Sequence, residues 1–307
     1  GHFAGSPDSV NSIFKRIAGR DTIGTANASV VRIESDNFEL LNLTVRNSYN
    51  ADRVHPESKE MNDNGQFTKG QHQAVAVMVA GADRVHLQDL ILRSHQDTLY
   101  LKSPAKGVTV RTNIVNCEIE GDVDFIFGQS TAWFERCTIR SLGNRAAQSW
   151  AIAPSTDIRT RFGFVFHDCD FVHDGSALAR AGDMRLGRQW FEGVRATPFG
   201  QPNIADYSCT LGAISTFDSP KGMISIATLN SVGKCVIQKS RIGSHISKIA
   251  PWDDWGGNTW NPRHRPVIYT AADQFTILSP WLSKQDISYE DVDPQMVFLE
   301  MLFNSDF

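Results

Sequence analysis

The sequence predicts an all-β protein built as a parallel β-helix, a solenoid in which each coil stacks on the coil before it. Two observations indicate this fold. From Val30 onward, short runs of β-forming residues alternate with turn residues, and helical periodicity is scarce. A six-residue phrase also recurs along the chain, and recurring β phrases without helices are typical of stacked coils.

Each copy of the phrase has a polar residue, then Leu or Cys, a variable residue, and an aliphatic or aromatic residue. Because side chains alternate along a strand, the second and fourth positions share one face. The closest copies are 20 and 27 residues apart, a spacing found in solenoids. A β-sandwich with coincidental similarity is the alternative interpretation. The copies begin at Asn42, Asp89, Asn116, Arg136, Asp168 and, more weakly, Lys239.

We expect one β-helix domain over residues 1–307, with long loops leaving the coils. Residues 1–28 lack a periodic pattern and are predicted as a loop or insertion. Wide gaps between phrases predict further loops at residues 50–70 and 191–232. Residues 256–307 are expected to form a C-terminal cap or tail.

Composition and charge exclude several classes of protein. The chain has 307 residues, a formal net charge of −4 and a pI near 6.1. Proteins that bind nucleic acid or a membrane surface need a basic face, so we expect neither partner. No apolar run approaches the roughly 18 residues that span a bilayer. Because the chain begins at Gly1 without Met, we expect its first coils and any targeting segment to be missing.

Two carboxylates occupy equivalent places in successive copies of the phrase. Asp97 lies seven residues after Leu90, and Asp124 lies seven residues after Cys117. If the copies are stacked coils, the two Asp residues share one station about 4.8 Å apart. Carboxylates that close cannot both ionise cheaply, so one pKa should rise while the other stays low. Such a pair can supply an acid from one carboxyl group and a nucleophile from the other. Taken alone, Asp124 could instead be a structural residue at a turn.

Cys117 and Cys137 also occupy equivalent stations, 20 residues apart. Stacked Cα atoms at strand spacing fall within disulfide range, so we predict a bond that closes the loop carrying Asp124. Two unpaired thiols in a core stack are the alternative. None of the five Cys residues forms a Cys-x-x-Cys pair and the nine His residues lack ligand spacing, so we expect no metal and no cofactor.

Amide, guanidinium and aromatic side chains accompany the two carboxylates. Gln73 opens a run one coil before Gln96, and a Gln amide can donate to a developing oxyanion. Arg188 and Trp190 share a strand face, so Arg188 could form a fork with a carboxylate and Trp190 could offer a flat wall to a sugar ring. The alternatives are amides that stack between coils, a surface Arg and a core Trp.

Four blocks stand in a specific order: Gln73–Val77, Gln96–Tyr100, Gly121–Gly128 and Leu186–Trp190. In this order they resemble the pectin methylesterase (pectinesterase) family, carbohydrate esterase family 8, and the layout is closest to its bacterial branch. The resemblance runs from about residue 22 to about residue 255. It implies a right-handed parallel β-helix and a reaction without a metal.

By this resemblance Asp124 is the nucleophile that attacks the methyl ester carbonyl of galacturonate. Asp97 protonates the departing methanol and then activates a water. Gln73 and Gln96 help to form the oxyanion hole, and Arg188 holds Asp124. The residues expected to line the sugar site are Trp190, Phe125 and Trp252. Bacterial members also carry a disulfide at the spacing of Cys117 and Cys137.

The sequence departs from the family at several points. The early Gly-x-Tyr-x-Glu block is absent, and Gln189 stands where Pro is usual. Asp122 stands where Thr is common. On a regular strand Asp122 would share a face with Asp124, and its negative charge could raise the pKa of Asp124.

The expected function is a carboxylic ester hydrolase that removes methyl esters from pectin. We expect a monomer that is extracellular, periplasmic or anchored to the outer membrane. One alternative is an esterase or thioesterase of the same fold that acts on a non-pectin acyl substrate. Others are a glycosidase, which also uses paired carboxylates, a polysaccharide lyase, which would need a calcium cluster, and a carbohydrate-binding solenoid without activity.

Overall fold

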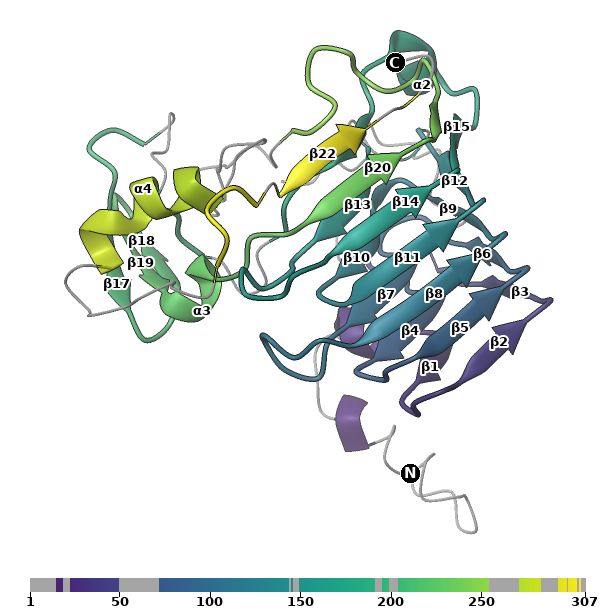
Figure 1. The fold of residues 1–307 in the computed structure, drawn as a ribbon, viewed down its shortest axis with the longest axis horizontal. Coiled ribbons are helices and arrows are strands. Elements are labelled where there is room, and N and C mark those ends of the chain that lie inside the picture. The colour runs from purple at the N-terminus through teal and green to yellow at the C-terminus, as the bar shows by residue number, and fades with distance from the viewer. Residues whose placement is uncertain are drawn as a thin grey trace.

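Three parallel sheets stack coil upon coil in the computed structural model (Figure 1). This arrangement confirms the predicted all-β parallel β-helix. The predicted loop at residues 50–70 lies outside the described residues, as does most of the predicted loop at residues 1–28. The structure describes residues 15–18, 23–49, 72–143, 145, 149–190, 195–198, 204–253, 271–282, 292–296, 298–302 and 304.

The chain passes through the three sheets in turn, so strands far apart in sequence pair side by side. Sheet A holds β1 (Val31–Ile33), β4 (Val77–Ala80), β7 (Leu99–Lys102), β10 (Val123–Gly128), β13 (Trp150–Pro154) and β16 (Arg185–Gly187). Sheet B holds β2 (Glu39–Leu41), β5 (Val85–Gln88), β8 (Arg111–Val115), β11 (Thr131–Glu135), β14 (Phe164–His167), β20 (Cys235–Gln238) and β22 (Leu299–Leu302). Sheet C holds β3 (Thr44–Arg46), β6 (Ile91–Arg93), β9 (Glu118–Gly121), β12 (Thr138–Ser141), β15 (Asp170–His173) and β21 (Arg241–Ile242).

The first residue of each repeated phrase turns the chain from sheet B into sheet C. All six first residues are left-handed, with φ between 50° and 54°. Asn and Asp tolerate this conformation better than other non-glycine residues, which explains why four of the six residues are Asn or Asp. Arg136 and Lys239 adopt it too, because the neighbouring coils fix the path of the backbone.

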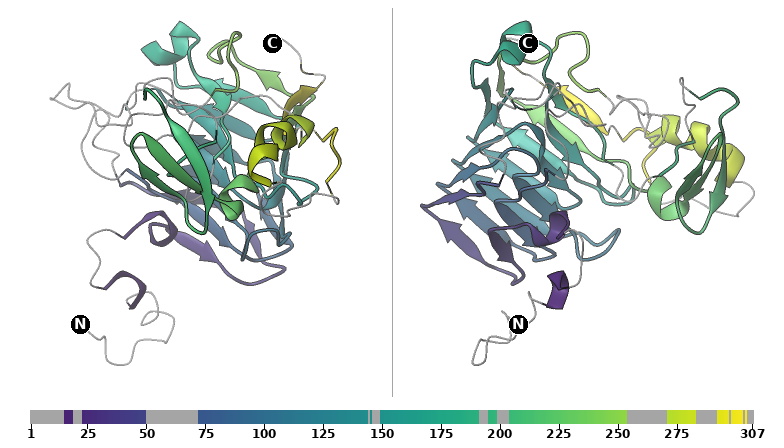
Figure 2. Two further views of the ribbon diagram at one scale, coloured as in Figure 1. Left: turned by 90° about the vertical axis from the view of Figure 1, so that its left-hand side faces the viewer. Right: turned by 180° about the vertical axis from the view of Figure 1, so that it is seen from behind.

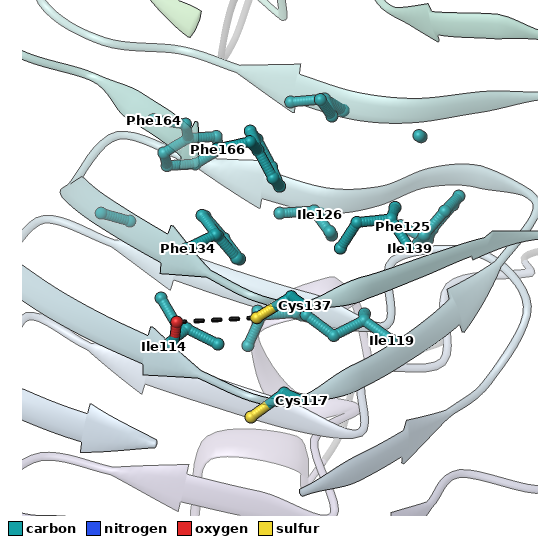
Figure 3. Packing of buried hydrophobic residues seen from close by; sticks show 14 of the residues in the cluster. Ile114, Cys117, Ile119, Phe125, Ile126, Phe134, Cys137, Ile139, Phe164 and Phe166 are labelled. Carbon is teal, nitrogen blue, oxygen red and sulfur yellow. Dashed lines mark hydrogen bonds between the residues drawn. The ribbon is translucent and has the colours of Figure 1, made fainter. Parts of the chain in front are cut away.

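The second and fourth residues of the phrase are buried, as alternation predicts, in every copy except the first, where Leu43 is 37% exposed. Leu90, Cys117, Cys137 and Cys169 are each no more than 2% exposed. Aromatic rings fill the interior behind them, and the rings of Phe134 and Phe166 on neighbouring strands stack with centroids 4.2 Å apart (Figure 3). Burial of each such side chain contributes about 1.5–3 kcal/mol, so the inward stack supplies most of the driving force for folding.

The predicted disulfide between Cys117 and Cys137 is not formed, because both residues are free thiols (Figure 3). Each thiol points to backbone carbonyl oxygens instead, Cys117 to Val115 at 3.3 Å and Cys137 to Glu135 at 3.4 Å. Cys169 repeats the pattern one coil later. Residues that repeat the same orientation at strand spacing keep their sulfur atoms too far apart to bond.

The segment predicted as a plain loop at residues 191–232 contains a small sheet, so this prediction is wrong. Its strands are β17 (Ser208–Gly212), β18 (Thr216–Asp218) and β19 (Lys221–Ser225), followed by α3 (Ile226–Leu229). The sheet lies beside the coils with α4 (Ala271–Leu282) against it (Figure 2). Leu278 of α4 packs on Ile224 and Leu229, so a helix distant in sequence covers the apolar face of the sheet.

The chain beyond residue 256 belongs partly to the coils. Strand β22 pairs with β20 and extends sheet B, whereas α4 packs against the small sheet.

Two further short helices are η1 (Thr25–Asn27) and α2 (Ala177–Ala181). Pro280 lies inside α4, near its end.

His245, just after β21, is fully buried, and neither of its ring nitrogens has a hydrogen-bond partner among the described residues. Burial and, to a smaller extent, the charge of His173 lower the pKa of His245 from 6.5 to about 4, while Asp174 opposes the shift. A histidine with a depressed folded pKa stabilises the fold fully above its unfolded pKa and loses that contribution as the pH falls.

We therefore expect the free energy of unfolding to fall by roughly 3 kcal/mol between about pH 6.5 and pH 4 through this one residue. Urea unfolding of wild type and of His245→Leu at both pH values measures it. The variant should lose less stability over this interval. An equal loss in both proteins would assign the acid sensitivity to other groups.

Candidate active site

The two carboxylates predicted to share one station do so at the corner where sheet C leads into sheet A. Asp97 and Asp124 are both left-handed, with φ of 68° and 50°. The backbone N–H of Asp97 donates to the carbonyl of Val123 at 3.1 Å, which ties the two coils together at this point. Equivalent backbone conformation on adjacent coils aims both side chains at the same corner.

Arg188 holds the Asp124 carboxylate in a two-pronged ion pair. Its Nε donates to Oδ1 of Asp124 at 2.9 Å, and its Nη2 donates to Oδ2. Arg188 is 3% exposed and Asp124 is 7% exposed, so the pair is largely shielded from water. Because Arg188 follows β16, two coils after β10, its side chain crosses the coil of β13 to reach Asp124. Charge-assisted bidentate bonds of this kind fix the carboxylate in place.

Asp97 is the member of the pair that favours the protonated form. Burial raises the pKa of its carboxyl well above the usual range, and the negative charge of Asp124 raises it further. Arg188 and the hydroxyl of Thr25 oppose this shift without cancelling it. Of the two carboxyl groups, Asp97 is therefore the one that has the raised pKa expected from the sequence.

The two glutamines lie on adjacent coils beside Asp97. Gln73 and Gln96 form a parallel bridge, and the N–H of Ala74 donates to the carbonyl of Gln96 at 3.1 Å. Gln96 is 6% exposed, while Gln73 is partly exposed. The pairing stacks the two residues as the sequence predicted.

Aromatic rings cover the outer face of sheet A next to these polar residues. Tyr100 and Phe127 stack with centroids 4.2 Å apart. Trp190 meets both rings edge-on, with its centroid 5.5 Å from that of Phe127 and 6.3 Å from that of Tyr100. Trp190 keeps part of its surface exposed, so a flat aromatic wall stands beside the carboxylates.

Phe125 and Trp252 were expected at the sugar site, and both expectations are wrong. Phe125 is 0% exposed and Trp252 is 1% exposed, and both belong to the inner core. Phe125 and Ile126 both belong to the core because the register of β10 is irregular between Val123 and Ile126, and Phe127 then takes the outer position. Trp252 packs beneath Gly187, where an added Cβ would lie 3.1 Å from its ring.

Thr25 is a site residue that the sequence reasoning missed. Its hydroxyl donates to Oδ2 of Asp97 at 3.4 Å, and the neighbouring Ala26 packs on the aromatic cluster of sheet A. Residues 1–28 carry no periodic pattern, so nothing local marks this contact. A left-handed Gly24, with φ of 68°, directs the chain into η1 and over the site.

Asp122 does not add an uncompensated charge beside Asp124. Its carboxylate accepts two hydrogen bonds from Arg145, and both residues are 0% exposed. Gln189, the other departure from the family pattern, donates from Nε2 to the carbonyl of Gly233 at 3.3 Å. This hydrogen bond connects the segment between α3 and β20 to the residues that follow β16, where Arg188 lies.

The described residues contain no group of three or more His, Cys, Asp or Glu side chains placed to hold a metal ion. Among the same residues, no helix is long and apolar enough to cross a membrane.

Comparison with known proteins finds relatives of one kind. The Pectinesterase family model matches residues 57–203. A pectinesterase of Ralstonia solanacearum is 32% identical over 229 residues, which are 73% of this chain and 47% of that protein. The chain spans about half the length of the bacterial pectinesterases that it matches.

Solved structures show the same fold. The pectin methylesterase of the rice weevil superposes with a TM-score of 0.62 at 21% identity, over 96% of this chain and 64% of that chain. A pectin methylesterase in complex with a hexasaccharide superposes with a TM-score of 0.53 at 27% identity, over 73% of this chain and 56% of that chain. With its β-helix and these matches, the chain is similar to the pectinesterase family, whose model matches residues 57–203.

Proposed function

We propose that this protein hydrolyses methyl esters of galacturonate units in pectin, with Asp124 as nucleophile and Asp97 as general acid and base. One observation carries the proposal. A carboxylate fixed by Arg188 stands one coil from a second carboxyl whose pKa is raised by burial. One charged and one neutral carboxyl group at the same corner are what a nucleophile and an acid need.

In the first half of the reaction, Oδ of Asp124 attacks the ester carbonyl carbon. Arg188 binds this carboxylate in one orientation, yet each oxygen keeps a lone pair free for attack. The side-chain amides of Gln73 and Gln96 donate to the oxyanion of the tetrahedral intermediate. The intermediate collapses as Asp97 gives its proton to the leaving oxygen, which departs as methanol and leaves an acyl-enzyme anhydride.

In the second half, Asp97 is a carboxylate and acts as base. It takes a proton from water, and the oxygen of that water attacks the carbonyl carbon of the anhydride. The carbon–oxygen bond to Asp124 breaks, which releases the galacturonate acid, a free Asp124 carboxylate and a protonated Asp97. The site returns to its starting state without a redox change.

The aromatic cluster of Trp190, Tyr100 and Phe127 provides the surface for the sugar chain beside the carboxylates. Pectin is a polymer outside the cell that makes it, so we infer an extracellular, periplasmic or outer-membrane-anchored protein. We also infer that it acts as a monomer, because the proposed residues all come from one chain.

We expect Asp124→Asn to lower kcat by about 10⁴-fold or more, because the amide is not a nucleophile. Methanol release from methylated pectin measures this loss. Asp168→Asn is the matched control, since Asp168 is also left-handed, with φ of 54°, but lies at the turn between β14 and β15. The control should keep full activity. Wild-type turnover by Asp124→Asn would end the assignment of the nucleophile.

Asp97→Asn should change activity and stability in opposite directions. Loss of the acid and base lowers kcat by about 10²–10⁴-fold. A carboxyl with a raised folded pKa destabilises the fold as the pH rises above its unfolded pKa, and an amide does not. Asp97→Asn should therefore melt higher than wild type at pH 7 but not at pH 3. Equal melting temperatures at pH 7 would contradict the burial of the acid.

The remaining activities are separated by the products formed from pectin. An ester hydrolase releases methanol while the viscosity of the polymer stays constant. Falling viscosity would indicate a glycosidase or lyase, and loss of activity in chelator would favour a calcium-dependent lyase. Turnover of short acyl thioesters without methanol release from pectin would favour the non-pectin esterase. We expect methanol release that persists in chelator.

A further inference from the structure

A second ion pair lies behind the proposed active site, where no solvent reaches it. Arg145 Nε donates to Oδ2 of Asp122 at 2.6 Å and Arg145 Nη2 donates to Oδ1 at 2.5 Å. Both residues are 0% exposed. Desolvation of two charges offsets most of their attraction, so a buried pair is weak evidence for stability alone. Its location suggests another role.

The Arg145 guanidinium has a third partner. Its Nη1 lies 2.9 Å from Nδ1 of His72, which is 1% exposed. A guanidinium only donates hydrogen bonds, so Nδ1 of His72 must accept. His72 is consequently neutral at Nδ1 and carries its proton on Nε2. The next residue in the chain is Gln73.

The backbone of Asp122 connects the same network to the other site residues. Its N–H donates to the carbonyl of His95 at 2.9 Å, and His95 directly precedes Gln96. The carbonyl of Asp122 accepts the hydroxyl of Ser149 at 2.7 Å. Asp122 stands two residues before Asp124. The network therefore reaches the residues that precede Gln73 and Gln96 and a residue two positions before Asp124.

Electrostatics place Arg145 close to the same corner. Its positive charge is among the influences that lower the pKa of Asp97, and it also lowers the pKa of His95. Arg145 comes from the loop between β12 and β13, and its side chain spans the coils of Asp122 and His95 to reach His72. One side chain thus links the coils that carry Gln73, Gln96 and Asp124.

We propose that Arg145 is a positioning residue for the esterase site, in which Asp122 fixes the guanidinium and the guanidinium holds His72, so that the Gln73 amide stays in register with Gln96. This inference rests on the proposed function. A lost oxyanion donor costs about 10²–10³-fold in kcat, and a misplaced one costs part of that. Asp122, which departs from the family pattern, thereby has a role as the anchor of Arg145.

The double variant Asp122→Asn/Arg145→Met tests the proposal without leaving a buried unpaired charge. Asn keeps an acceptor for the N–H of Val123, and Met fills a similar volume. We expect a melting temperature near that of wild type, a kcat lower by about 10–100-fold, and a KM within about twofold. The same double change at the surface pair of Asp83 and Arg111, whose arginine is exposed, is the control and should leave kcat unchanged.

Two variants of His72 separate positioning from packing. His72→Asn offers an oxygen where Nδ1 accepts, whereas His72→Leu offers no acceptor. We expect His72→Asn to recover kcat relative to His72→Leu when both fold. Equal losses in the two variants, or wild-type kcat in the folded double variant, would overturn the positioning role.

An NMR measurement does not require enzymatic turnover, so it tests the positioning role independently of the proposed function. Nitrogen-15 NMR of the folded wild type should show His72 protonated at Nε2, and the double variant should change both this signal and the side-chain amide signal of Gln73. If wild type releases no methanol, the esterase proposal fails, while the two NMR signals still decide whether Arg145 holds His72 and Gln73. Unchanged signals in the double variant would refute that link.

Discussion

The arrangement at the corner of sheet A depends on one interaction, the shielded ion pair between Arg188 and Asp124. An ionised carboxylate with little access to water is costly unless a partner holds it, and a bidentate guanidinium is the partner that matches its geometry. Once Asp124 is kept in place, its charge acts on Asp97 one coil away. The difference between the two carboxyl groups follows from the burial of Asp97 and from the charge of Asp124, which Arg188 pairs with directly.

Stacking makes such a pair possible in a chain with few helices. Parallel coils bring residues that are 27 positions apart to one corner, and the left-handed conformation recurs there at Asp97 and Asp124. Arg188 comes from two coils further along, and Arg145 reaches back across the coils before it. The rigid core of stacked rings beneath them holds these long side chains at fixed separations.

Much of the site could be predicted because the repeat assigns residues to stations. The positions of Asp97 and Asp124 follow from counting along the phrase, and Gln96 directly precedes Asp97. Phe125 was expected at the sugar site from the family resemblance and not from the repeat, and the structure buries it in the core together with Ile126. The disulfide prediction failed because equivalent stations predict proximity of Cys117 and Cys137 but also give their thiols the same orientation.

The sequence alone determined the solenoid, the shared corner of the carboxylates and the aromatic residue Trp190, because period and alternation are local properties of a strand. Only the tertiary structure decided that Thr25 reaches Asp97, that a helix near the C-terminus covers the small sheet, and that Arg145 neutralises Asp122. These contacts join segments with no shared pattern, and burial and charge matching select them when the coils have stacked.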